Sequence, residues 1–113
     1  MRNDALDATF AALADPTRRA ILAQLRCGEA SVVELARPFK LTPRAISKHV
    51  SVLENAGLVT RGRDAQRRPT RLRLQPLEHV DRWLDDYRAL WNRRFDKLEA
   101  RLERLQEKKH VKK

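Results

Sequence analysis

Cysteine, glycine and aromatic residues are scarce in this chain of 113 residues. The one cysteine, Cys27, excludes an intrachain disulfide and argues against a secreted scaffold held by disulfides. Three scattered glycines cannot form a loop that cradles a phosphate group. The sequence also shows no serine or cysteine nucleophile with an orienting acid. We therefore expect a protein that is not an enzyme and that binds no cofactor.

Long apolar runs are missing as well. No run approaches the roughly 18 apolar residues of a membrane span. Acids and Pro16 interrupt the N-terminal stretch, where a signal peptide would have its apolar core. We therefore expect a cytoplasmic protein without a membrane partner. The length fits a single domain over residues 1–113, because domains of roughly 100–150 residues are the commonest.

Positive charge is abundant and clustered. The chain has 25 lysine and arginine residues against 15 acids, a net charge of +10 and a pI near 10.8. A pI above about 9 is typical of nucleic-acid-binding domains. The segment from Lys40 to Arg73 holds nine basic and two acidic residues, so +7 of the +10 is concentrated there. This clustering favours nucleic acid as the partner, with an anionic membrane surface, an acidic protein or simple solubility charge as alternatives.

Apolar spacing and capping residues predict four helices before the end of the basic segment, over about 3–13, 16–27, 31–38 and 43–56. Ser31 and Glu34 have capping-box spacing, and Thr42-Pro43 is typical of a helix start. The last two of these helices are joined by a short turn. They form a helix-turn-helix, a motif whose second helix enters the major groove of DNA.

The helix over about 43–56 has two different faces. Its predicted inward stripe consists of Ile46, Val50 and Leu53. The residues broadly opposite that stripe are Arg44, Ser47, Lys48 and Ser51. Such side chains can meet phosphates and base edges, although an ordinary solvated face is the alternative. His49 lies at the edge of the stripe, where it can either touch a phosphate or pack beside the core.

The stretch over about 60–74 is predicted to form a two-stranded wing. In its second half, the apolar residues Leu72 and Leu74 alternate with the basic residues Arg71 and Arg73. This alternation predicts one apolar face and one basic face. Its polar tip contains Arg67 and Arg68.

A last helix is predicted over about 76–108, followed by a disordered tail over 109–113. Its apolar seam is heptad-like with one stutter and consists of Leu77, Val80, Leu84, Tyr87, Trp91, Phe95, Leu98, Leu102 and Leu105. A helix of roughly 30 residues is about 45 Å long, which so small a body cannot cover. The apolar seam that the body leaves uncovered predicts pairing with a second copy, with packing inside the chain as the alternative. The first helix, with its predicted buried stripe Leu6, Phe10 and Leu13, is expected to contribute to this pairing.

These elements predict a mainly α fold with a small β-hairpin: a winged helix-turn-helix with five helices in the order α-α-α-α-β-β-α. The chain resembles the ArsR-type winged helix-turn-helix repressors in four stretches, "FAALADPTRRAILAQL", "SVVELARPFKLTPRAISKHVSVLENAGLV", "TRGRDAQRRPTRLRL" and "WLDDYRALWNRRF". They run from about residue 10 to residue 95 in the order and spacing of the family.

The resemblance implies a homodimer that binds double-stranded DNA and regulates transcription, usually as a repressor of its own operon. The implied contacts of the recognition helix are Arg44, Ala45, Ser47, Lys48, His49 and Ser51. The implied wing contacts are Arg61, Arg63, Arg67, Arg68 and Arg71. The dimer, built from the first and last helices, would use Leu6, Phe10, Trp83, Leu84, Tyr87, Trp91, Phe95, Leu98 and Leu102.

The chain departs from the metal-sensing members of this family. They carry a Cys-x-Cys type motif in the third helix, where this chain has Leu35-Ala36-Arg37, or paired Asp and His on the last helix. Zinc needs about four ligands, and His79 with Asp81 across a dimer is the conceivable set here. We expect no metal, and the chain resembles the metal-independent branch, with the releasing signal open.

Two alternatives remain from the sequence. One is a metal- or redox-sensing repressor, whose redox version would use Cys27, although a buried thiol is expected at that position. The other is a basic protein-interaction module without sequence-specific DNA binding.

Overall fold

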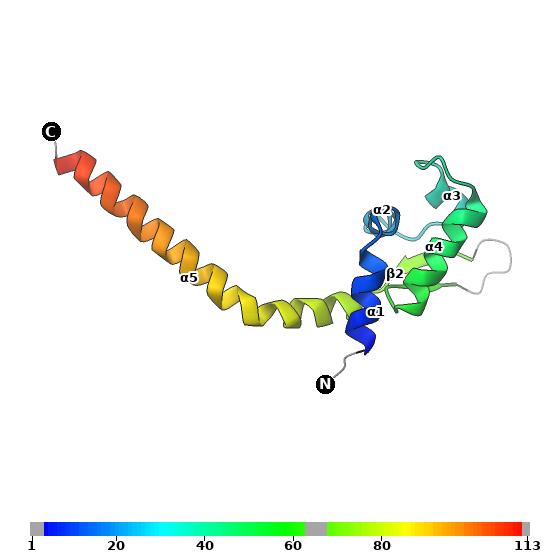
Figure 1. The fold of residues 1–113 in the computed structure, drawn as a ribbon. Coiled ribbons are helices and arrows are strands. Elements are labelled where there is room, and N and C mark those ends of the chain that lie inside the picture. Colours follow the sequence, from blue (N-terminus) through cyan, green and yellow to red (C-terminus); the bar gives the residue numbers. More distant parts are fainter. Residues whose placement is uncertain (1–3, 63–67, 112–113) are drawn as a thin grey trace. The chain divides into compact units, whose positions relative to one another are not determined.

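The computed structural model describes residues 4–62 and 68–111. Within these residues, helices and strands follow one another in the predicted order (Figure 1): α1 Asp4–Leu13, α2 Pro16–Leu25, α3 Val32–Ala36, α4 Pro43–Asn55, β1 Val59–Arg61, β2 Thr70–Leu72 and α5 Gln75–Val111. The predicted winged helix-turn-helix is therefore confirmed. The chain divides into two compact units, Met1–Val80 and Asp81–Lys113.

Side-chain caps fix where the helices of the first unit begin. At α2, Asp15 Oδ2 accepts a hydrogen bond from the backbone N–H of Arg18 at 2.9 Å. At α4, Thr42 Oγ1 accepts one from the backbone N–H of Ala45 at 3.1 Å. Ser31 forms the predicted capping box at α3. Each cap satisfies a backbone donor that has no partner inside its own helix, so these starts follow directly from the sequence.

The core of the first unit lies against the inner face of α4. Ile46, Val50 and Leu53, the predicted inward stripe, are fully buried. They belong to a cluster that also contains Ala12, Ile21, Leu22, Leu25, Leu35, Ala36, Leu58 and Val59. Burial of one Leu, Ile or Val side chain stabilises the fold by about 1.5–3 kcal/mol. This packing fixes the rotation of α4, and therefore which of its residues face outward.

The predicted buried stripe of α1 is wrong at one position. Phe10 is 37% exposed, whereas Thr9 and Ala12 are buried, and Leu6 and Leu13 are half-buried. Thr9 tolerates burial because its hydroxyl donates to a carbonyl of its own helix at 2.9 Å. The inner face of α1 is thus formed by its small side chains, which leaves Phe10 outside the core.

The two strands pair antiparallel in the register Val59–Leu72, Thr60–Arg71 and Arg61–Thr70. Thr70 is fully buried, and its backbone N–H donates to the Ala30 carbonyl at 2.8 Å, which ties the hairpin to the segment before α3. The predicted apolar face of the wing is wrong at Leu74, which is 57% exposed. The reason is that β2 ends at Leu72, so the alternation of a strand does not reach Leu74.

The helix α5 continues to Val111, beyond the predicted end near residue 108, and residues 112 and 113 lie outside the described part. In the second unit Leu84 is half-buried, and the other large apolar side chains are between 41% and 64% exposed: Trp83, Tyr87, Leu90, Trp91, Phe95, Leu98, Leu102 and Leu105. None of the described helices is both long and apolar enough to cross a lipid bilayer.

Candidate nucleic-acid interface

The outward face of α4 is cationic. Arg44 and Lys48 are exposed on it, four residues apart and therefore one helical turn from each other. Within the described part of the chain the side chain of neither has an ion-pair or hydrogen-bond partner. Ser51 is exposed one turn further along, and Ser47 and Ala45 are half-buried beside them. This surface can accept an anion and can also present hydrogen-bond donors.

Arg61 connects the wing to this helix. Its Nη2 donates to the Ser47 carbonyl at 2.9 Å and to Ser51 Oγ at 3.1 Å, and lies 3.5 Å from Ser47 Oγ. Its Nε is 3.9 Å from a carboxylate oxygen of Glu54. The side chain is only 11% exposed. Of the arginines predicted to contact DNA, this one lies against the recognition helix rather than in solvent.

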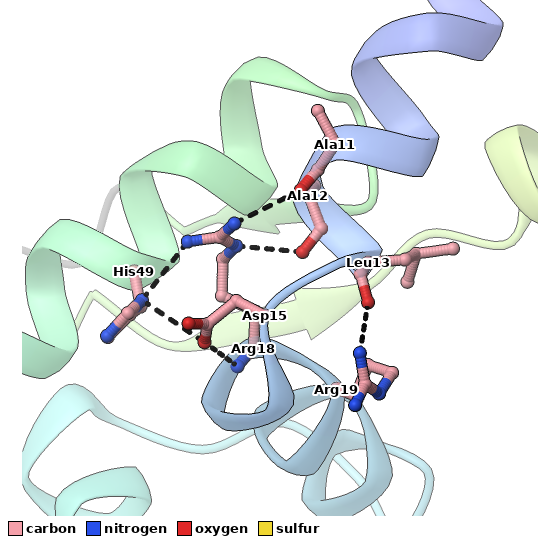
Figure 2. A network of polar contacts seen from close by, with 7 residues as sticks. All are labelled: Ala11, Ala12, Leu13, Asp15, Arg18, Arg19 and His49. Atoms are coloured by element: carbon pink, nitrogen blue, oxygen red, sulfur yellow. Dashed lines mark hydrogen bonds and ion pairs between the residues drawn. The ribbon is translucent and has the colours of Figure 1, made fainter.

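His49 faces the start of α2 (Figure 2). Its Nδ1 lies 3.4 Å from Arg18 Nη1 and 3.8 Å from Asp15 Oδ2, and the side chain is 25% exposed. The sequence left two roles open for this histidine, a phosphate contact or packing beside the core. The geometry favours the second, because the ring is engaged with neighbouring elements of the first unit.

Arg18 joins α1 and α4 through α2. Its Nε donates to the carbonyl of Ala12 at 2.7 Å, its Nη2 donates to that of Ala11 at 3.1 Å, and its Nη1 contacts His49 (Figure 2). Arg19 donates to the next carbonyl at 2.7 Å. The last carbonyls of a helix have no partner within it, so these two arginines satisfy the end of α1. Sequence reasoning missed both residues, although a basic pair just after a helix end is a usable signal.

The predicted wing arginines have different surroundings. Arg71 forms an ion pair with Glu29, next to the bridge between Ala30 and Thr70. Arg68 is exposed and has a φ of 37°, in the left-handed region. Arg63 and Arg67 lie outside the described residues. Arg68 is thus the described residue of the wing tip that presents a cation to solvent.

The predicted dimerisation residues of α5 form an open apolar face. Trp83, Leu84, Tyr87, Leu90, Trp91 and Arg94 line a shallow hollow of about 290 Å³ within the second unit. The rings of Trp83 and Tyr87 lie 5.0 Å apart between centroids, in a tilted arrangement. Exposed apolar patches of this kind are typical of interaction surfaces.

Metal-binding groups do not gather in the part of the chain that the structure describes: no three His, Cys, Asp or Glu residues there are placed to hold an ion. Asp81, from the conceivable pair with His79, forms an ion pair with Arg88. Cys27 is exposed, so the expected burial of its thiol is wrong. It lies in the turn after α2, beyond the last buried residue of that helix, Leu25.

The N-terminal cap of α2 predicts that the stability of the fold depends on pH. The backbone N–H of Arg18 donates to the carboxylate and holds the pKa of Asp15 below its usual value, an effect that desolvation opposes and the charge of His49 assists. A lowered pKa stabilises the folded state above the unfolded value of about 3.9, and this contribution is lost as the pH falls through the folded value.

We therefore expect Asp15→Asn to melt at a lower temperature than the wild type at about pH 7, with a difference that shrinks as the pH falls below about 4. Asparagine caps helices about as well as aspartate, so the difference isolates the charge. Thermal unfolding followed by circular dichroism measures it, with Asp96→Asn on α5 as a control for net charge. A difference that stays the same at about pH 7 and about pH 3 contradicts the prediction.

A helix-turn-helix with a paired hairpin, a buried inner stripe and a cationic outer face defines the class of winged helix proteins that bind DNA. Comparisons agree with this geometry. Residues 13–62 match the family described as "Helix-turn-helix domain". The chain is 41% identical over 81 residues to YuzN of Bacillus subtilis, an uncharacterised HTH-type transcriptional regulator, covering 66% of this chain and 88% of YuzN.

Solved structures give the same result. The ArsR family transcriptional regulator RHA00566 is 38% identical and superposes with a TM-score of 0.72, over 78% of this chain and 97% of its own. The homodimeric winged helix-turn-helix DNA-binding domain of Mb0332 from Mycobacterium bovis is 25% identical, with a TM-score of 0.59, over 81% of this chain and 82% of its own.

The chain belongs to the ArsR family of HTH-type transcriptional regulators. It is therefore a DNA-binding regulator of transcription, and this family is not one of enzymes. The expectation that the resemblance raised is confirmed at this level.

Proposed function

We propose that the protein is a homodimeric repressor that occupies an operator near a promoter and excludes RNA polymerase. The observation that carries this proposal is the outer face of α4, where Arg44 and Lys48 are exposed opposite a fully buried stripe. A helix held in this way presents its cations and hydroxyls to one groove of DNA. The proposed site of action is the cytoplasm.

In the proposed complex α4 enters the major groove and the wing lies on the flanking DNA. Arg44 and Lys48 neutralise phosphates and set the register, and Arg44 and Ser47 read base edges. Arg68, with Arg63 and Arg67 of the same wing, extends the contacts beyond the groove. The positive charge concentrated between Lys40 and Arg73 supports these DNA contacts, because each phosphate contact adds sequence-independent affinity.

The proposed dimer joins two copies through α1 and α5. The exposed apolar side chains of α5 and the 37% exposed Phe10 support it, because a second copy would remove them from water. The homodimeric state of the Mb0332 domain supports the pairing of two copies. Two-fold symmetry then places the two α4 helices in successive major grooves, roughly 34–36 Å apart.

Fluorescence anisotropy tests the proposed function. Purified protein is titrated with labelled DNA from upstream of its own gene and with a shuffled duplex, across a series of salt concentrations. We expect the native duplex to bind at least about a thousandfold more tightly, which is within the usual range for specific sites.

Two results would count against this proposal. Equal affinity for both duplexes with a steep salt dependence would describe a non-specific basic DNA binder. No binding at low salt would instead favour the basic protein-interaction module.

A further inference from the structure

The hydrogen-bond roles at Arg61 are fixed by chemistry. A guanidinium group carries only donors, so Ser51 Oγ, at 3.1 Å from Nη2, must accept a hydrogen bond from it. Nη2 carries two hydrogens, which the Ser47 carbonyl and Ser51 Oγ accept, so Ser47 Oγ at 3.5 Å shares one of them as a weaker acceptor. The Ser51 hydroxyl therefore uses an oxygen lone pair on Arg61, and its own hydrogen points in another direction.

A serine within a helix can donate its hydroxyl hydrogen to the carbonyl four residues earlier. Thr9 does so in α1, where its Oγ1 donates to the carbonyl of Ala5 at 2.9 Å. For Ser51 the corresponding carbonyl is that of Ser47. This oxygen has two lone pairs: one accepts the backbone N–H of Ser51 in α4, and the other accepts Arg61 at 2.9 Å.

Arg61 thus occupies one acceptor position of the Ser51 hydroxyl and the free acceptor position of the helix carbonyl to which that hydroxyl would otherwise donate. Within the described residues, neither Ser47 nor Ser51 donates a hydroxyl hydrogen to the protein. Ser51 is exposed on the proposed DNA-binding face, and Ser47 is half-buried beside it. The Ser51 hydrogen is therefore turned away from Arg61 and from the Ser47 carbonyl.

We propose that Arg61 is a positioning residue for sequence recognition, which sets the hydroxyl of Ser51, and through the weaker shared contact that of Ser47, as hydrogen-bond donors toward the base edges. The inference rests on the proposed function. In the major groove, guanine O6 and N7 and thymine O4 accept hydrogen bonds, whereas the N4 amino group of cytosine donates one. A hydroxyl held as a donor therefore discriminates against cytosine at the position that it meets. A freely rotating hydroxyl would accept either.

Arg61 has a second property in this role. The Arg61 side chain is 11% exposed and its Nε lies near Glu54, so its charge lies against the recognition helix and not in solvent. It should therefore contribute to sequence preference without adding to the number of phosphates that the protein neutralises. This separates it from an arginine that contacts the DNA backbone, whose removal flattens the salt dependence of binding.

The test uses the full-length chain and a random-sequence duplex library. Four proteins select from the library, and the bound duplexes are sequenced: wild type, Arg61→Met, Arg61→Lys and the double variant Ser47→Ala/Ser51→Ala. A fifth protein combines Arg61→Met with the two serine changes. The affinity for the duplex that the wild type selects is then measured for each protein across a salt series. Thermal melting shows that each variant is folded.

We expect the wild type to select against cytosine at one or two positions in each half-site. Arg61→Met should weaken this discrimination about 2- to 10-fold, the range of one net hydrogen bond, and the double serine variant should do the same. The combined variant should lose no more, because all three residues act through the same hydrogen bonds. Arg61→Lys, which keeps three donors, should restore part of the preference. The salt slope should be equal in all five proteins.

Three results overturn the inference. One is a salt slope that falls by about 0.9 for each Arg61 removed, which would make it a phosphate contact. Another is an Arg61→Met variant that keeps the wild-type base preference. The third is a serine variant with unchanged preference beside an Arg61→Met variant that binds nothing, which describes a purely structural arginine. A wild type that selects no sequence overturns the proposed function itself, so the two failures are distinguishable.

Discussion

Replacing Leu98 and Leu102 together by glutamate is expected to convert the protein into a monomer. The two side chains are 53% and 51% exposed along the apolar face of α5, which needs a partner to leave water. In a two-stranded pairing the new carboxylates of both copies would meet in an apolar seam, where unpaired charges are strongly disfavoured. Loss of the second half-site contact should reduce operator affinity by about 100- to 10,000-fold, the usual gain from linking two binding modules.

Sedimentation equilibrium measures the oligomeric state, and anisotropy with the operator duplex measures the affinity. The matched control is Lys97→Gln with Arg104→Gln, which changes the net charge by the same amount at polar positions of the same helix. We expect this control to remain a dimer. A Leu98→Glu/Leu102→Glu variant that still sediments as a dimer would place the interface elsewhere.

Replacing Arg44 by alanine should have the largest effect on sequence recognition. This side chain is exposed on the outer face of α4 without a described partner, so it is available to both base edges and phosphates. A bidentate contact between arginine and guanine discriminates by about 1–3 kcal/mol, which is roughly 5- to 150-fold in relative affinity. We therefore expect Arg44→Ala to lower affinity for the operator and to equalise the affinities of duplexes that differ at one base pair.

The measurement is a set of anisotropy titrations over single-base operator variants. Arg26→Ala serves as the control, since it removes the same charge from the end of α2. Arg68→Ala is an informative second comparison. As a backbone contact it should weaken all duplexes alike and reduce the salt slope. If Arg44→Ala also weakens all duplexes alike, then Arg44 contacts phosphate only.

The elements of the first unit were predictable because their signals are local. Thr42 and Pro43 start α4, Ser31 caps α3, and Gly57 follows α4 with a φ of 78°, a conformation that favours glycine. The inward stripe of α4 was also predictable, because a helical period of 3.6 residues assigns each apolar residue to one face. Such patterns depend on near neighbours in the sequence, which the chain itself supplies.

The partners of the polar side chains were not predictable in the same way. Arg61 and Arg68 belong to one basic segment, yet one is bound to α4 and the other is exposed. Nothing in the residue types separates them, because the difference depends on how the hairpin packs against the helix. The same applies to His49, whose contacts come from the start of α2, and to Phe10, which is exposed because α1 turns Thr9 and Ala12 toward the core. The contacts to DNA remain predictions, and the experiments above address them.

The arrangement of Arg18, His49 and Arg61 has a practical consequence for redirecting the protein to new operators. Contacts that hold α4 in place come from α2 on one side and from β1 on the other. Arg44 and Lys48 take no part in them, whereas Ser47 and Ser51 are bound to Arg61. An engineer can therefore exchange Arg44 and Lys48 while keeping the two serines, whereas transplanting the whole helix into another scaffold would remove the contacts that orient it.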